Sequence, residues 1–144
     1  LMMPTAGGDD CIRDYTRLLD EAPIDIVCCG IGVNGHLAFN DPPVADFADP
    51  VDVKVIELDP VCRQQQLEDG GFESLDDVPR VALTLTIPRL LRAETIFCVV
   101  PGPMKREAVR RTLNDPIGEA CPATALRRHP DCTLYVDADS LPQA

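Results

Sequence analysis

Residues 24–42, IDIVCCGIGVNGHLAFNDP, decide the fold of this chain and hold most of its candidate chemistry. The first six residues form an apolar run that is typical of a buried strand. Three glycines and a histidine follow at once, and Pro42 ends the segment. A strand that runs into such a loop is the usual way in which an α/β domain presents a ligand site at the carboxyl end of its sheet.

Strand-like and helical patterns alternate along the rest of the chain. Apolar or alternating runs predict strands at residues 51–58, 82–87, 95–100 and 132–136. Capping and turn signals predict helices that begin near residues 9, 60, 88, 104 and 122. The run at 95–100 is the most apolar, so we expect it to be buried on both faces, as strands of parallel sheets are. This alternation predicts a layered α/β fold with a mostly parallel sheet.

Length and charge limit the class of protein. The 144 residues, 45% of them hydrophobic, are enough for one domain with its own core. The formal net charge of −11 argues against a nucleic-acid partner, because phosphate backbones are bound by clustered Lys and Arg. A small phosphorylated substrate needs only a local pocket of cations and N–H groups. No segment approaches the ~20 apolar residues of a membrane span, so we expect no membrane partner.

The cysteines predict neither a disulfide framework nor a metal site. None forms a CxxC pair or another metal-ligand spacing. Four lie in strand-like runs, where a free cysteine behaves as a small hydrophobe. The odd count and the lack of secretory features indicate reduced thiols in a cytoplasmic protein. The seven are Cys11, Cys28, Cys29, Cys62, Cys98, Cys121 and Cys132.

His36 is the strongest candidate for chemistry. An imidazole exchanges protons near neutral pH, although a lone histidine more often satisfies the backbone of its loop. The flanking Asn34 and Gly35 and the carboxylate of Asp41 favour the catalytic interpretation. A neighbouring carboxylate raises the basicity of an imidazole and selects its tautomer. Asn34 can only orient other groups through hydrogen bonds.

Gly30, Gly32 and Gly35 are candidates for substrate contact. Glycine permits a close approach of backbone to ligand, although a tight turn without a ligand would use the same residues.

Lys105 is a candidate for phosphate binding. A cation in the first turn of a helix opposes the helix dipole, whereas a helix N-terminus with a lysine makes a phosphate site. The alternative is a solvated lysine.

Residues 30–42 resemble the signature of the glucosamine-6-phosphate deaminases. That pattern reads Gly-Ile/Val-Gly-x-Asn/Asp-Gly-His-Ile/Leu-Ala/Gly-Phe-Asn-Glu-Pro, and the chain differs from it at one position, where Asp41 stands for Glu. The sister family, the 6-phosphogluconolactonases, shares Gly-x-Gly-x-Asp-Gly-His but typically continues Thr-Ala-Ser-Leu-Phe-Pro. Residues 37–42, LAFNDP, therefore favour the deaminases.

The resemblance implies an enzyme that converts glucosamine 6-phosphate and water to fructose 6-phosphate and ammonia in amino-sugar catabolism. It implies a cytoplasmic protein with a small sugar phosphate as its partner, and no metal or organic cofactor; homo-oligomerisation is left open. His36 would assist opening of the sugar ring, with Asn34 and Asp41 in support. Lys105 would contact the phosphate, and Arg63 lies where family members place another phosphate-contacting arginine.

The resemblance also implies a three-layer, Rossmann-like sheet flanked by helices. Residues 1–144 would be the carboxyl-terminal portion of a single sugar-phosphate isomerase domain. The family's Gly-rich phosphate loop and its Asp-Glu-Tyr segment, which carries the base for C2, would belong to an amino-terminal half absent from this sequence. We therefore expect these residues alone to be inactive. Two alternatives stay open: a lactonase-type hydrolase that uses the same histidine, and a non-catalytic sugar-phosphate-binding regulator of this fold.

Overall fold

The computed structural model describes residues 9–143. Its elements follow the predicted order, with ends shifted by a few residues. The predicted helix at 104 begins as a short 3-10 turn, and the one at 122 is a 3-10 helix throughout. The elements are α1 (Asp9–Asp20), β1 (Ile26–Cys29), β2 (Val53–Glu57), α2 (Pro60–Glu68), β3 (Val81–Leu85), α3 (Ile87–Leu90), β4 (Thr95–Val100), η1 (Pro103–Lys105), α4 (Arg106–Asn114), η2 (Pro122–Arg128) and β5 (Cys132–Val136).

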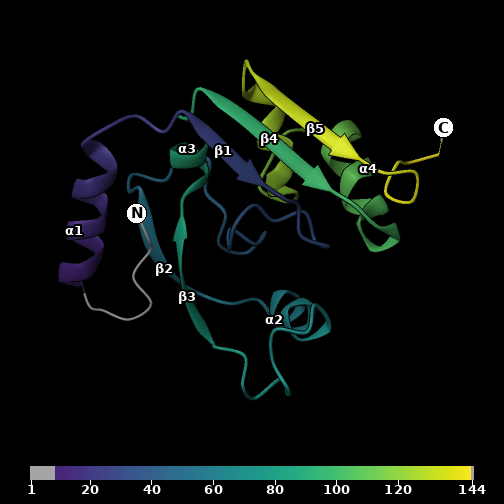
Figure 1. The fold of residues 1–144 in the computed structure, drawn as a ribbon, viewed down its shortest axis with the longest axis horizontal. Coiled ribbons are helices and arrows are strands. Elements are labelled where there is room, and N and C mark those ends of the chain that lie inside the picture. The colour runs from purple at the N-terminus through teal and green to yellow at the C-terminus, as the bar shows by residue number, and fades with distance from the viewer. Residues whose placement is uncertain (1–8, 144) are drawn as a thin grey trace.

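The strands form two sheets. β1, β4 and β5 make a three-stranded parallel sheet with β4 in the centre, in which Ile26 pairs with Thr95 and Val100 pairs with Val136. β2 and β3 form a separate antiparallel pair, which lies between α1 and α2 in Figure 1. The α/β class and the mostly parallel sheet are confirmed.

The core fills the space between the parallel sheet and the helices on one of its faces. Figure 1 shows α4 and η2 behind the sheet. Alternate residues of β4 point toward these helices and are fully buried, each aliphatic side chain contributing about 1.5–3 kcal/mol to stability. The buried set comprises Ile31, Leu37, Ile87, Leu90, Ala93, Ile96, Cys98, Val100, Ala108, Val109, Ala123, Ala125 and Leu126.

Among residues 9–143, no helix covers the other face of the parallel sheet. Ile26, Val99 and Tyr135, one from each strand, are exposed by 55%, 54% and 51%. Cys28 is exposed on the same sheet. The predictions that residues 95–100 are buried on both faces and that Cys28 lies in a core are therefore wrong. The physical reason is that the described helices cover only one side of these strands.

Local signals set the ends of the elements around the site. Asp59 caps α2, because its carboxylate accepts a hydrogen bond of 2.8 Å from the N–H of Val61, and Pro60 occupies the first helical position. Thr86 caps α3 in the same way through the N–H of Arg89. These caps fix where α2 and α3 begin. α2 follows the end of β2 and α3 follows the end of β3, and the chain then enters the parallel sheet as β4.

Among the described helices, none combines the length and the apolar character that crossing a bilayer requires.

Candidate functional site

The signature loop, residues 30–42, folds back on itself at the carboxyl end of β1. The N–H of Gly32 donates to the carbonyl of His36 at 3.0 Å, and the N–H of Gly35 donates to the carbonyl of Gly32 at 2.9 Å. Gly35 has a φ of +91°, which glycine adopts without strain. Its carbonyl accepts from the N–H of Ala123 at 2.8 Å, which ties the loop to η2. The turn therefore holds the histidine at the end of the parallel sheet.

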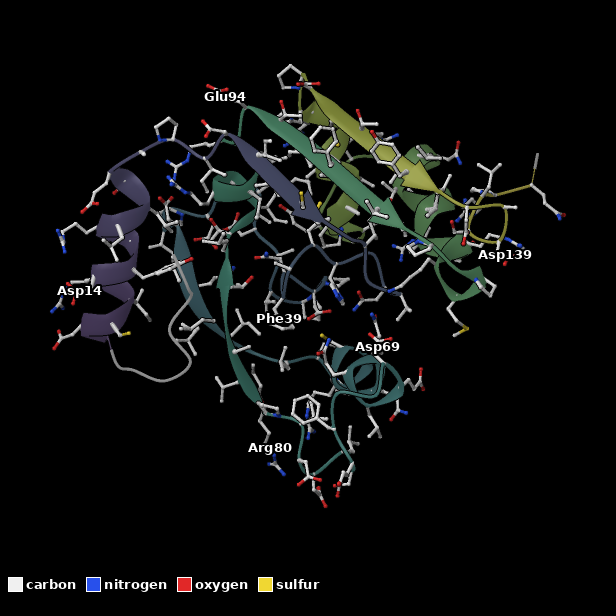
Figure 2. All side chains as sticks on the ribbon, viewed as in Figure 1. Asp14, Phe39, Asp69, Arg80, Glu94 and Asp139 are labelled. Atoms are coloured by element: carbon white, nitrogen blue, oxygen red, sulfur yellow. The ribbon has the colours of Figure 1, made fainter. Side chains whose placement is uncertain are left out.

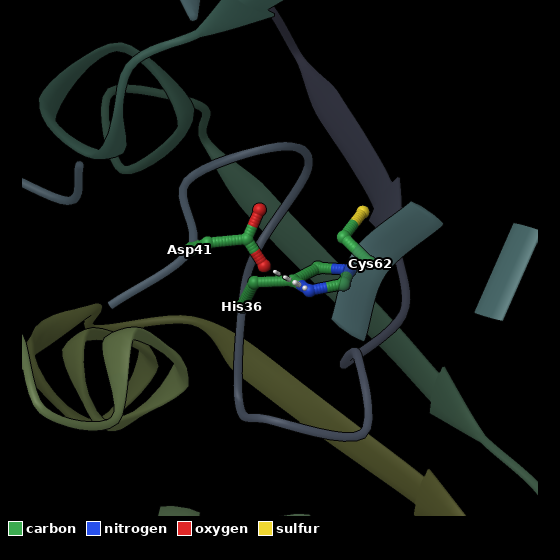
Figure 3. Close-up of side chains that lie close together, drawn as sticks. All are labelled: His36, Asp41 and Cys62. Carbon is green, nitrogen blue, oxygen red and sulfur yellow. Dashed lines mark ion pairs between the residues drawn. The ribbon is translucent and has the colours of Figure 1, made fainter. Parts of the chain in front are cut away.

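Asn34, His36 and Asp41 form a closed set of polar contacts. Nδ1 of His36 lies 2.9 Å from Oδ1 of Asp41 (Figure 3). The same nitrogen lies 2.9 Å from Oδ1 of Asn34. The Nδ2 group of Asn34 donates to the same oxygen of Asp41 at 2.8 Å. A ring nitrogen that faces two oxygen acceptors carries the proton, so Nε2 keeps its lone pair. The set therefore presents a proton acceptor at Nε2.

The glycines of the loop have different roles. A Cβ on Gly32 would lie 2.1 Å from Cε1 of His36, so only glycine leaves room for the imidazole. Gly30 lies where a Cβ would be 3.3 Å from the carbonyl of Val99. Gly30 and Gly32 both line the cavity beside the histidine. Gly35 packs on Cys121 instead, so the structure places it in the turn and not at the cavity.

One cavity joins the histidine to the predicted phosphate site. It has a volume of about 440 Å³, and its walls come from the signature loop, α2, β4 and η1. Lys105 is half-buried there, and burial lowers the pKa of its ammonium while the charge of Asp69 opposes that shift. The structure thus brings Gly30, Gly32, His36 and Lys105 together. The other lining residues are Ile31, Ala38, Gln65, Asp69, Val99, Val100 and Pro101.

Arg63 lies elsewhere. Its guanidinium donates to the carbonyl of Val78 at 3.0 Å and also to the carbonyl of Leu75. It lines a separate cavity of about 530 Å³, on which Asp41 also borders. The structure does not bring Arg63 together with Lys105, and its hydrogen bonds fasten the segment after α2.

One face of α2 supplies site residues that sequence reasoning missed. Gln65 accepts from the N–H of Val33 at 3.2 Å and donates to Asp69 at 3.3 Å. Figure 2 shows Asp69 on the side of α2 toward the parallel sheet. Cys62 is fully buried, and burial together with the charges of Asp41 and Asp59 raises its pKa to about 12. The spacing of residues 62, 65 and 69 places them on one helical face, which is the signal that could have found them.

Comparison with known proteins gives the relationship of the chain. No family model matches it. Curated glucosamine-6-phosphate deaminases of Bacillus thuringiensis and Bacillus cereus are each 39% identical to it over 133 residues. Each match covers 92% of this chain and 48% of the relative. The chain therefore spans about half the length of the curated relatives it matches.

Solved structures agree. A monomeric glucosamine-6-phosphate deaminase has a TM-score of 0.86 and 36% identity, over 94% of this chain and 55% of that one. A 6-phosphogluconolactonase from Leishmania guyanensis has a TM-score of 0.67 and 23% identity, over 91% and 51% of the two chains, which shows a shared fold alone. In sequence and in fold, this chain is similar to about half the length of the glucosamine-6-phosphate deaminases that it matches.

Proposed function

We propose that this chain supplies the ring-opening and phosphate-binding groups of a glucosamine-6-phosphate deaminase. The reaction converts glucosamine 6-phosphate and water to fructose 6-phosphate and ammonia in amino-sugar catabolism. The observation that carries the proposal is the hydrogen-bonded set of Asn34, His36 and Asp41 at the edge of a cavity that also holds Lys105. The similarity to curated deaminases supports the choice of substrate.

Ring opening is the step that His36 suits. Its Nε2 takes the proton of the O1 hydroxyl as the bond between C1 and O1 becomes a carbonyl double bond. The same nitrogen then delivers this proton to the ring oxygen, whose bond to C1 breaks. The imidazolium formed in between is stabilised by the carboxylate of Asp41, 2.9 Å from Nδ1. Asn34 hydrogen-bonds both the imidazole and the carboxylate, and so holds the two groups in position. A positioned acid–base group of this kind typically contributes about 10²–10⁴-fold to rate.

Phosphate binding falls to Lys105. Its ammonium lines the same cavity as His36 and stands at the start of α4, where the helix dipole also favours an anion. Asp69 borders the cavity too, and its charge opposes the lowering of the Lys105 pKa that burial causes. The cavity therefore holds the phosphate at one side and the sugar ring near Nε2.

The proton transfer between C2 and C1 needs a further base. We assign no residue of this chain to that step, since the chain spans about half the length of its curated relatives. The departure of ammonia is likewise unassigned.

An assay of the full protein with glucosamine 6-phosphate tests the proposal. We expect equal amounts of ammonia and fructose 6-phosphate, and no hydrolysis of 6-phosphogluconolactone in a parallel assay. Lactone hydrolysis without ammonia release would replace the proposal with the lactonase alternative. Binding of the sugar phosphate with neither reaction would identify a regulator.

A further inference from the structure

Cys62 lies next to two groups of the proposed site without a part in the proposed reaction. A nitrogen of His36, a carboxylate oxygen of Asp41 and the sulfur of Cys62 all lie within 4.8 Å of one another. The three side chains are almost completely buried, at 7%, 1% and 0% exposure. Figure 3 shows how the signature loop carries the first two and α2 carries the third.

One carboxylate oxygen of Asp41, Oδ2, is available for a further contact. Its Oδ1 accepts from Asn34 and faces Nδ1 of His36. Its Oδ2 is buried and has no hydrogen-bond partner among residues 9–143. Leaving a buried carboxylate oxygen unpaired is costly, so such an atom calls for an explanation. A cation beside Oδ2 would supply the missing partner.

We propose that His36, Asp41 and Cys62 bind one thiophilic divalent cation of the zinc type, and that the bound ion inhibits the protein. An imidazole, a carboxylate and a thiolate are all ligands that Zn²⁺ takes in proteins, and a fourth position would stay open for water. Bond lengths of about 2.0–2.3 Å place tetrahedral ligands roughly 3.5 Å apart. The three donors therefore need to draw in by little more than about 1 Å from their present separations.

Binding changes the protons of the site in a defined way. The S–H bond of Cys62 breaks as the sulfur–metal bond forms, and that proton leaves to solvent. At His36 the ion takes the place of the proton on Nδ1, which is the nitrogen beside Asp41. That proton moves to Nε2. The lone pair of Nε2 is then lost, so the histidine can no longer accept a proton from a sugar hydroxyl.

Titration of the purified full chain with Co²⁺ tests the site. Cobalt adopts the geometry of zinc and, unlike zinc, gives a thiolate-to-metal charge-transfer band. We expect one equivalent of Co²⁺ to produce this band, Zn²⁺ to displace it, and Cys62→Ser to abolish it. Cys121→Ser is the matched control, since Cys121 is also buried, at 2% exposure, but lies outside the cluster. The band should survive in this control.

A band that persists in Cys62→Ser, or that Cys121→Ser removes, would overturn the proposal, and so would the absence of a band in the wild type. Asp41→Asn is the second variant, because it keeps the thiol and nearly the shape of the site. We expect it to weaken Co²⁺ binding at least tenfold, and unchanged affinity would also refute the site. These are binding measurements, so their failure is distinguishable from a failure of the proposed deaminase activity.

Discussion

The carboxylate of Asp41 reaches His36 although it is one methylene shorter than the glutamate of the family pattern. Its Oδ1 lies 2.9 Å from Nδ1 of His36, and Asp41 is only 1% exposed. The loop turns tightly between the two residues. The N–H of Asn40 donates to the carbonyl of Leu37 at 3.0 Å, and Ala38 has a φ of +51°. In this turn the shorter aspartate is long enough to contact His36.

His36→Asn should lower kcat by about 10²–10⁴-fold, because the variant loses Nε2 as a proton carrier. Its side-chain amide can still donate to Asp41 from near the position of Nδ1, so the free energy of unfolding should change little. Steady-state kinetics and denaturant unfolding measure the two quantities. A loss of stability that accounts for the lost activity would make His36 structural.

His129→Ala is the control for that experiment. Nε2 of His129 bonds the carbonyl of Ala93 at 2.8 Å, and its Nδ1 accepts from the N–H of Asp131 at 3.1 Å. These bonds hold the turn before β5, away from the cavity. We expect a loss of about 1 kcal/mol of stability and an unchanged kcat.

Gly32→Ala should lower kcat by about a hundredfold, because the added methyl group would lie 2.1 Å from the imidazole of His36 and must push it aside. Gly118→Ala is the matched control, since a Cβ there meets nothing within 4 Å. Kinetics of the two purified variants make the comparison. Equal effects of the two substitutions would contradict the close contact between Gly32 and His36.

Asp41→Asn should lower kcat by at least about tenfold, since a neutral amide stabilises an imidazolium less well than a carboxylate does. Asp41→Glu restores the residue of the family pattern and should keep or raise activity. Both variants need only steady-state assays. A large drop in Asp41→Glu would show that this loop is fitted to the shorter side chain.

Lys105 predicts a pH dependence of substrate binding. Burial lowers the pKa of its ammonium below the usual 10.5, so the cation is lost as pH rises through that lowered value. KM should therefore rise in the alkaline range at a lower pH than an exposed lysine would give. Lys105→Arg should move this rise to higher pH, because guanidinium stays protonated. Identical alkaline limbs in the two proteins would exclude Lys105 from phosphate binding.

The same shift has a consequence for stability. The folded protein holds the proton of Lys105 less tightly than the unfolded chain does. Burial of Lys105 therefore lowers the free energy of unfolding while the lysine is charged. This loss becomes smaller as pH rises through the lowered pKa.

Local sequence was enough to predict that the polar residues of the signature loop lie together. Asn34, His36 and Asp41 lie within eight residues, so the tight turn of a single loop brings them together. The spacing of the glycines predicts that turn. The helices and strands were also predictable, since caps and hydrophobic periodicity act over a few residues. The open face of the parallel sheet was not, because an apolar strand carries no mark of whether a second layer covers it.

By itself, then, the sequence determined the order of the elements, the loop chemistry and the family resemblance. Only the tertiary structure decided which distant side chains meet that loop. It placed Lys105 in the cavity that His36 lines. It placed the guanidinium of Arg63 outside that cavity, where it donates to the carbonyl of Val78 after α2. It also buried the thiol of Cys62 beside Asp41. Such contacts join residues far apart in the chain, and they depend on how α2 and β4 pack, which no local pattern encodes.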